Sequence, residues 1–163
     1  SEMCIRDRVC MERISKENYY LDIAETVLER ATCLRRIYGA IIVKNDEIIS
    51  TGYNGAPRGR ANCVDMGYCS REAMKVPRGE RYELCRSVHA EANAITKLAR
   101  SGNNSDQATL YVTASPCIEC AKLIIQAGIR RVVYAEQYRL TDGIDLLRRA
   151  GVEVEHLPLD LSV

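Results

Sequence analysis

The sequence predicts an α/β fold, a three-layer α/β/α sandwich around a central mixed sheet of about five strands. Three observations support this prediction. A chain of 163 residues with 47% hydrophobic residues suits one domain that can bury a core. A helical pattern is followed by a β-rich hairpin. After the hairpin, strand and helix patterns alternate, which is typical of a layered sheet with helices on both faces.

The N-terminal part contains a tail and then a helix. Residues 1–10 lack a clear period and look like read-through of adapter DNA or a frayed terminus. We therefore expect residues 1–14 to be a disordered or artefactual tail, outside a domain that spans 15–158. Ser15 and Asn18 are both suitable caps for a helix that runs to about Arg30. Apolar residues recur in it at helical spacing, which predicts that one face packs on a core.

A hairpin and a long polar segment follow. The β-rich runs 39–43 and 47–52 are joined by the polar residues 44–46, which predicts a hairpin. Residues 53–87, called the insert below, are rich in glycine, arginine and cysteine. The insert is too long for an idle connection in a compact domain. We therefore expect it to be functional or to be held in place by specific interactions.

The second half of the chain is more regular. Its expected elements, in order, are a helix at 89–99, a strand at 109–113, a helix at 116–127, a strand at 131–135, a helix at 140–150 and a strand at 152–154. Gly151 is expected to stop the last helix.

Bulk composition excludes several classes of function. The net charge of +1 provides no basic excess for wrapping nucleic acid, so a small polar substrate is favoured over a polymer. No apolar run approaches the ~20 residues that cross a membrane, and the N-terminus lacks the apolar stretch of a signal peptide. The chain has eight cysteines but is larger than typical disulfide-dense domains. We expect a cytoplasmic protein.

Two short clusters indicate a catalytic zinc site. His89, Cys117 and Cys120 supply three ligands and leave the fourth position open for water, as catalytic zinc sites do. Pro116 is expected at the first helical position, where the helix N-terminus would stabilise both thiolates. Zinc acidifies a bound water enough to yield hydroxide near pH 7. Glu91 is then placed to shuttle the proton to a substrate and to its leaving group.

Each residue of these clusters has a simpler explanation when taken alone. The C-x-x-C pair could be a redox pair or half of a zinc ribbon, His89 a structural histidine and Glu91 part of a solvated helix face. Together, however, H-x-E and P-C-x-x-C form a known signature of zinc-dependent nucleobase deaminases. The joint pattern predicts deamination chemistry.

With these motifs, the chain resembles the cytidine deaminase superfamily, and most closely its deoxycytidylate (dCMP) deaminases, from about Tyr19 to Val154. The matching stretches are Cys33-Leu-Arg-Arg36 with Gly39-Ala40, Gly52-Tyr-Asn-Gly-Ala-Pro57, His89-Ala-Glu-Ala-Asn-Ala-Ile95, Leu110-Tyr-Val-Thr113, Pro116 to Cys120 and Ala127-Gly-Ile129. The H-A-E and P-C-x-x-C motifs mark the superfamily. The G-Y-N-G-x-P and C-x-x-R motifs point to its nucleotide branch.

The resemblance implies hydrolytic deamination of dCMP to dUMP and ammonia, which feeds thymidylate synthesis. It also implies that His89, Cys117 and Cys120 bind zinc, that Glu91 shuttles the proton, and that the fold is cytidine deaminase-like.

The resemblance further implies contacts to the nucleotide. Asn54 would hold the sugar and the base edge, although Asn-Gly also predicts a tight turn with positive φ. The N–H of Ala90 would contact the pyrimidine carbonyl. Arg35 or Arg36 is the candidate for the phosphate, since arginine offers a planar fork to it. Tyr138 would close over the nucleotide, or simply pack.

Four other cysteines have no place in the catalytic centre. Some dCMP deaminases, including phage enzymes, carry a second, structural zinc, and Cys33 and Cys63 match two of its ligands. Ser87 stands where the phage pattern has an acidic ligand. Cys69 and Cys85 could complete a four-cysteine site instead, which would order the insert. The alternative is that these cysteines are buried as small hydrophobes.

Partners and rival functions stay open. The resemblance implies homo-oligomers, often hexamers, that dCTP activates and dTTP inhibits. The rival enzymes are a tRNA adenosine deaminase and a pyrimidine deaminase of riboflavin biosynthesis. The near-neutral charge and the 52–57 motif argue against the tRNA enzyme. A non-catalytic zinc module that senses nucleotides is a further alternative, against which the presence of Glu91 argues.

Overall fold

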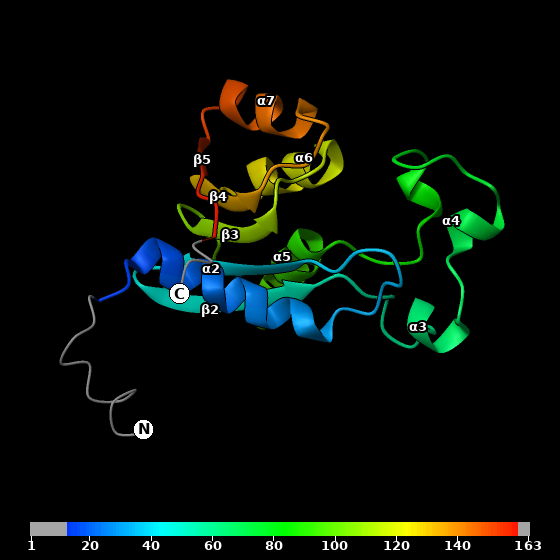
Figure 1. Cartoon of the computed structure of the whole chain (residues 1–163). Coiled ribbons are helices and arrows are strands. Elements are labelled where there is room, and N and C mark those ends of the chain that lie inside the picture. Colours follow the sequence, from blue (N-terminus) through cyan, green and yellow to red (C-terminus); the bar gives the residue numbers. More distant parts are fainter. Residues whose placement is uncertain (1–12, 160–163) are drawn as a thin grey trace.

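The computed structural model describes residues 13–159 (Figure 1). The strands are β1 (Gly39–Lys44), β2 (Glu47–Tyr53), β3 (Thr109–Ala114), β4 (Arg131–Glu136) and β5 (Glu153–His156). The helices are α2 (Lys16–Val27), α3 (Cys63–Met66), α4 (Ser70–Ala73), α5 (Ala90–Ser101), α6 (Ile118–Gln126) and α7 (Asp142–Arg149), with 3-10 turns η1 (Leu28–Arg30) and η2 (Tyr82–Leu84).

The five strands form one mixed sheet in the order β2-β1-β3-β4-β5. β1 pairs antiparallel with β2 and with β3, whereas β3, β4 and β5 run parallel. Parallel neighbours need crossover connections, and α6 and α7 provide them. The predicted α/β class and the mixed five-stranded sheet are confirmed.

Two apolar layers hold helices on opposite faces of the sheet. On one face, Leu21 and Ala24 of α2 pack with Ile41 and Val133. On the other face, α5, α6 and α7 share a larger core with the sheet. Fully or almost fully buried members of this core include Ile42, Ala94, Leu98, Leu110, Ile124, Val132 and Leu147. Alternate strand residues therefore face different helices, which completes the three-layer sandwich.

The helix boundaries confirm some local predictions and correct one. Ser15 is the N-cap of α2, and its Oγ accepts a hydrogen bond from the Asn18 N–H at 3.2 Å. The helix then continues through η1 to Arg30. The prediction that Pro116 occupies the first helical position is wrong, because α6 begins at Ile118 with Cys117 as its N-cap. The cap thus falls on the predicted metal ligand itself.

The insert lies to one side of the sheet, with α3 and α4 within it (Figure 1). Its two α-helices have four residues each, and apart from η2 it has little regular structure. The isolated bridge between Gly55 and Val88 joins its two ends. The insert is therefore anchored beside the sheet at both ends.

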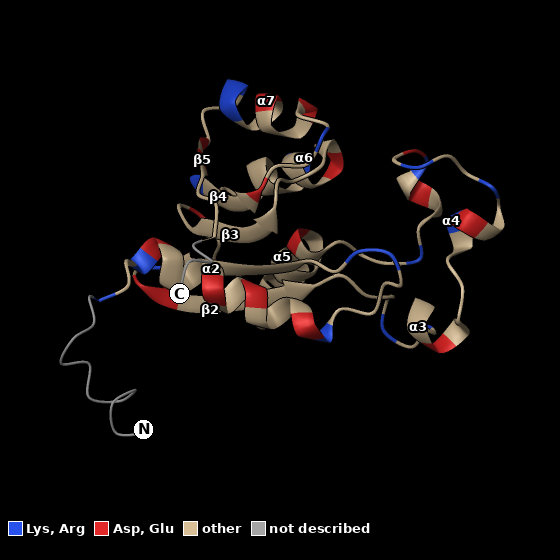
Figure 2. Cartoon of the chain, viewed as in Figure 1, with Lys and Arg blue, Asp and Glu red and all other residues tan. Residues whose placement is uncertain are grey.

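Charges and termini complete the outline. Figure 2 shows acidic and basic residues at opposite ends of α7. Asp142 and Asp145 lie in its first turn and Arg148 and Arg149 in its last, an arrangement that complements the helix dipole.

None of the helices in residues 13–159 combines the length and apolarity needed to cross a membrane. Of the predicted tail, residues 1–12 lie outside the described residues, and the remaining two are exposed.

Candidate active site

Two helix N-termini carry the predicted metal ligands. His89 is the N-cap of α5 and Cys117 is the N-cap of α6, with Cys120 in the first turn after it. α6 follows directly on the carboxyl end of β3, the edge at which open α/β sheets bind ligands. The unpaired amides and positive dipole end of a helix stabilise thiolates there. All three predicted ligands therefore lie at the start of a helix, and the two helix starts meet in one place.

Two glycines allow the close packing that positions these helix starts. A Cβ on Gly52 of β2 would lie 2.3 Å from the carbonyl oxygen of Ala90, so the first turn of α5 rests directly on the strand. A Cβ on Gly143 of α7 would lie 2.3 Å from the carbonyl oxygen of Pro116. Larger residues would push both ligand-bearing turns away from their observed positions.

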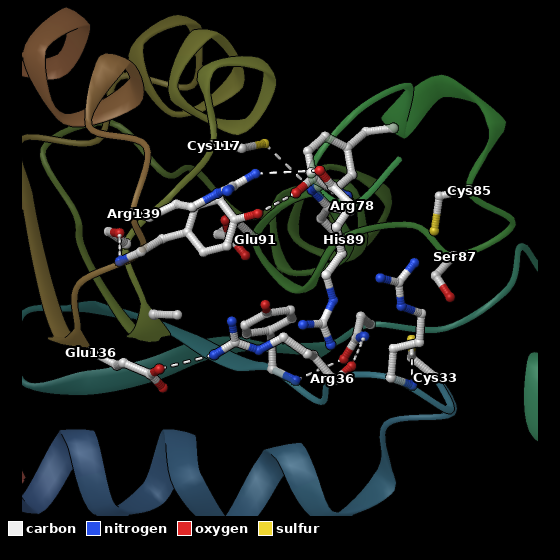
Figure 3. A pocket seen from close by; sticks show the side chains of 18 of the residues that line it. Cys33, Arg36, Arg78, Cys85, Ser87, His89, Glu91, Cys117, Glu136 and Arg139 are labelled. Atoms are coloured by element: carbon white, nitrogen blue, oxygen red, sulfur yellow. Dashed lines mark hydrogen bonds and ion pairs between the residues drawn. The ribbon is translucent and has the colours of Figure 1, made fainter. Parts of the chain in front are cut away.

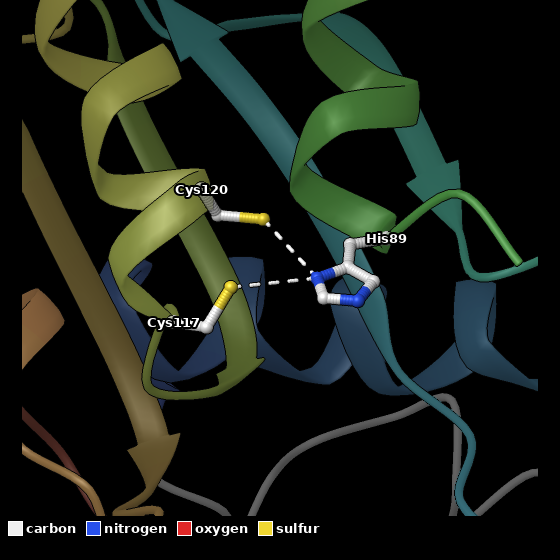
Figure 4. A group of neighbouring side chains, drawn as sticks. All are labelled: His89, Cys117 and Cys120. Atoms are coloured by element: carbon white, nitrogen blue, oxygen red, sulfur yellow. Dashed lines mark hydrogen bonds between the residues drawn. The ribbon is translucent and has the colours of Figure 1, made fainter. Parts of the chain in front are cut away.

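The three ligand atoms are spaced as zinc requires. His89 Nδ1 lies 3.5 Å from Cys117 Sγ and 3.4 Å from Cys120 Sγ (Figure 4). Tetrahedral zinc with Zn–N of ~2.0–2.1 Å and Zn–S of ~2.3 Å separates N and S by about 3.6 Å. Within residues 13–159 this is the one group of three or more such side chains whose donor atoms all lie within 4.8 Å of one another. The donor set and its spacing fit zinc, with one position left for a small ligand.

Hydrogen bonds link the three donor side chains and shift their pKa values in different directions. The pKa of Cys117 falls to about 4, first because the Cys120 thiol donates to it and also because His89 does. The shared proton raises the pKa of Cys120, and the bond to Cys117 raises the pKa of His89. Metal ligands must be deprotonated, so zinc would take the place of these shared protons.

Glu91 stands beside this centre on the first turn of α5. It is 6% exposed, and burial raises the pKa of its carboxyl above the ordinary value. A carboxyl with a raised pKa holds a proton more readily than an ordinary glutamate does, as a group that accepts and passes on a proton must. The position and the acidity of Glu91 both suit a proton shuttle.

The centre opens into a pocket of about 570 Å³, a size typical of small-molecule sites. His89, Glu91 and Cys117 line it on one side (Figure 3). The insert, the loop before β1 and the loop after β4 supply the other walls. The pocket is rich in arginine, with five arginines against two glutamates.

The residues predicted to contact the nucleotide lie at this pocket, with one exception. Asn54, Arg35, Arg36 and Tyr138 all line it, whereas Ala90 is fully buried and does not. The backbone N–H of Ala90 nevertheless belongs to the first turn of α5, between His89 and Glu91.

Asn54 is bound tightly to its surroundings. It is 4% exposed, its Oδ1 accepts from the Tyr38 N–H at 2.8 Å, and its Nδ2 donates to the Arg36 carbonyl at 2.9 Å. The predicted tight turn is wrong, because neither Asn54 nor Gly55 has a positive φ. Gly55 instead exchanges two backbone hydrogen bonds with Val88. Asn54 therefore fixes the pocket edge that leads into β1.

Both arginines that the sequence nominated have acidic partners. Arg35 Nε lies 3.1 Å from Glu72 Oε1, which joins the loop before β1 to the insert. Arg36 Nη2 lies 2.9 Å from Glu136 Oε1 and its guanidinium approaches the Tyr138 ring at 6.0 Å. Both cations are therefore held in place before any ligand binds.

Arg71 and Tyr82 of the insert are among the pocket-lining residues that were not predicted from the sequence. Arg71 is 8% exposed and lies over the ring of Tyr82, with Cζ 4.5 Å from the centroid. The Tyr82 hydroxyl meets that of Tyr138 at 2.5 Å. Neither residue belongs to a periodic pattern or a spaced motif, so only the length of the insert hinted at such a role.

The four remaining cysteines gather near one another without reaching ligand distance. Cys33 and Cys85 line the pocket, and Cys63 and Cys69 are buried. Burial raises the pKa of Cys63, with Cys33 and Cys85 next in effect. All four are free thiols. The second zinc therefore stays a prediction.

Known proteins share the motifs and the fold. Residues 14–136 match the family model of the cytidine and deoxycytidylate deaminase zinc-binding region. ComE operon protein 2 of Bacillus subtilis is 40% identical over 151 residues, which cover 92% of this chain and 75% of that protein. Deoxycytidylate deaminase of Enterobacteria phage T4 is 36% identical over 174 residues, which cover 88% of this chain and 90% of that protein.

A solved structure is similar over most of its length. The dCMP deaminase of cyanophage S-TIM5, crystallised in complex with dCMP and dUMP, is 38% identical with a TM-score of 0.74, and the match covers 89% of this chain and 100% of that one. The family model covers most of the chain and the relatives exceed one third identity. The chain therefore belongs to the cytidine and deoxycytidylate deaminase family.

Proposed function

We propose that this protein hydrolyses dCMP to dUMP and ammonia, and so supplies dUMP for thymidylate synthesis. The observation that carries the proposal is the open three-ligand group with buried Glu91 beside it, at the side of an arginine-rich pocket. The relatives point the same way, because the phage T4 protein is a deoxycytidylate deaminase and the cyanophage enzyme binds dCMP and dUMP.

The residues around the centre divide the work of hydrolysis. His89, Cys117 and Cys120 would hold zinc, which when bound supplies a Lewis acid that activates water for attack on the amino-bearing ring carbon. Glu91 accepts a proton from the attacking water and delivers it to the ring nitrogen. It later moves a proton to the departing amino group, which leaves as ammonia. Burial keeps bulk water from competing with these transfers.

The remaining contacts place the nucleotide. Asn54 uses one Nδ2 hydrogen on Arg36 and has a second one for the sugar. The Ala90 N–H is proposed to bind the pyrimidine carbonyl. Arg35 or Arg36 meets the phosphate, and Tyr138 closes over the nucleotide from the loop after β4.

We further propose a second, structural zinc held by Cys33, Cys63, Cys69 and Cys85. Its support is the gathering of four free thiols around an insert with little apolar core. Metal analysis of the purified chain tests this directly. Two zinc ions per chain, falling to one in Cys63→Ser, are expected; a single zinc in the wild type contradicts the second site.

We also propose that the protein is a cytoplasmic homo-oligomer, with a hexamer as the assembly to test. We propose that dCTP activates it and that dTTP inhibits it. Free cysteines suit a reducing compartment, and apolar side chains such as Leu34 and Ile37 are about half exposed. Sedimentation velocity and dCMP turnover with each effector are the tests. A monomer that ignores both nucleotides would contradict these two proposals.

The decisive experiment follows ultraviolet absorbance of the zinc-loaded chain with dCMP, dCTP, cytidine and deoxycytidine side by side. Turnover is expected to be fastest with dCMP. Inertness toward all four overturns the proposed function and favours a tRNA or riboflavin-pathway substrate, or a non-catalytic zinc module. A salt-sensitive binding test against tRNA then separates the polymer substrate from the others.

A further inference from the structure

Arg71 of α4 differs from the other arginines around the pocket in its surroundings. It is 8% exposed, yet none of the carboxylates in residues 13–159 lies within 4.0 Å of it. Its Nη1 donates to the Glu80 carbonyl at 2.9 Å, and its Nε is buried with no hydrogen-bond partner. A buried cation without an anion is unfavourable unless something compensates it.

The side chain of Arg71 is nevertheless held in one place. Its guanidinium lies over the Tyr82 ring, a cation–π contact. That ring meets the His89 ring edge-on, with centroids 5.9 Å apart, and its hydroxyl bonds to Tyr138. Tyr82 therefore ties Arg71 to the metal ligand on one side and to the loop after β4 on the other.

The pocket gives an anion access to Arg71, and a bound anion would compensate the buried charge. Arg71 lines it, and arginines outnumber carboxylates there by five to two. Arg35 and Arg36 already face Glu72 and Glu136, and Arg78 and Arg139 are exposed at the rim (Figure 3). Arg71 thus combines burial, a donor without an acceptor and the lack of a competing carboxylate. An anion entering the pocket would compensate the charge of the Arg71 guanidinium.

We infer that Arg71 binds the phosphate of the nucleotide and determines the preference for a nucleoside monophosphate over the free nucleoside. The inference rests on the proposed function and deepens it. It assigns the main phosphate contact to the insert, with Arg35 or Arg36 as a secondary cation. Tyr82 acts as a positioning residue, because its ring contacts the guanidinium of Arg71 beside the site.

The test compares Arg71→Gln and Arg71→Lys with the wild type on dCMP and on deoxycytidine. Losing a charge-assisted hydrogen bond is expected to raise KM for dCMP by about 10–100-fold. The kcat for dCMP and the turnover of deoxycytidine are expected to change little. Arg71→Lys keeps the charge but loses the planar fork, so an intermediate KM is expected. Arg60→Gln, an exposed insert residue outside the pocket, is the matched control.

A second readout does not depend on turnover. Inorganic phosphate is expected to raise the thermal midpoint of the zinc-loaded wild type and of Arg60→Gln, but not that of Arg71→Gln. If Arg71→Gln fails to fold, the same titration on Arg71→Lys replaces it, with a weakened shift expected. Equal losses on dCMP and deoxycytidine, or an unchanged phosphate shift in the variants, overturn the inference. A wild type that binds phosphate through Arg71 but leaves dCMP intact overturns only the proposed function.

Discussion

The two sides of the pocket are built in different ways. The helical side consists of the first turns of α5 and α6, which carry the predicted zinc ligands and Glu91. These helices pack through buried residues such as Leu98 and Ile124. The insert contributes Arg71 and Tyr82 from segments with only four-residue helices and a 3-10 turn. Its buried residues are Cys63, Cys69 and Arg71 among others, rather than aliphatic side chains.

This difference indicates that the helical side carries out the proposed reaction and that the insert recognises the substrate. Apolar burial holds the reacting groups rigidly, because a close-packed core resists displacement. Ion pairs and hydrogen bonds hold the insert, among them Arg35–Glu72 and the Tyr82–Tyr138 contact. Such contacts are individually weak and can be exchanged without disturbing the sheet. Changes on the helical side should therefore abolish reaction or folding, whereas changes in the insert should alter substrate preference.

The largest effect is expected from the ligands themselves. Cys120→Ser should lose the catalytic zinc and reduce deamination to background, because the remaining pair cannot hold the ion. Metal analysis and dCMP turnover measure both effects. Lys122→Ser, at an exposed position of the same helix, is the matched control and should keep both the zinc content and the turnover of the wild type. A fully active Cys120→Ser would refute the ligand assignment.

The proton shuttle should give the next largest effect. Glu91→Gln is expected to lower kcat by ~10²–10⁴-fold while zinc content stays the same, because the amide cannot carry the proton. Steady-state kinetics and metal analysis on the same sample provide the measurement. Glu119→Gln, an exposed glutamate on the first turn of α6, should be close to wild type. Full activity of Glu91→Gln would remove the shuttle assignment.

Core packing behind the helical side comes third. Ile124 is fully buried on α6, and Ile124→Ala should lower the free energy of unfolding by ~2–5 kcal/mol through lost burial and a cavity. Its neighbour Leu123 is 45% exposed, so Leu123→Ala should change that free energy by only about 0.5 kcal/mol. Urea denaturation measures both variants. Similar losses would show that α6 is not held by its buried face.

The smallest effect is expected at the link between insert and sheet. Glu72→Gln removes the partner of Arg35, and the Glu72 side chain is 60% exposed. The free energy of unfolding should fall by ~1 kcal/mol or less, and the difference should shrink at high salt. Urea denaturation at two salt concentrations is the measurement. A loss as large as that of Ile124→Ala would contradict the comparison between the two sides.

Much of the fold and of the site could be predicted, because the periodicities and motifs that indicate them lie within short stretches of the sequence. Strand and helix periodicities located every element of the main sheet, and the H-A-E and P-C-x-x-C motifs identified the three residues that meet at 3.4–3.5 Å. The errors were also local. Pro116 lies before the cap rather than inside α6, and Gly55 pairs with Val88 instead of forming a turn. The error at Gly55 reflects a partner in space, Val88, that the local pattern does not contain.

The sequence by itself determined the sheet, its two helical layers and the grouping of His89, Cys117 and Cys120, because periodic burial and motif spacing are properties of a few adjacent residues. Only the tertiary structure decided which arginine is buried without a carboxylate, and that Tyr82 joins it to His89 and Tyr138. Those facts depend on contacts between segments up to 56 residues apart, where no period or spacing rule applies. A cation's role depends on which anion lies near it, and folding alone brings the two together.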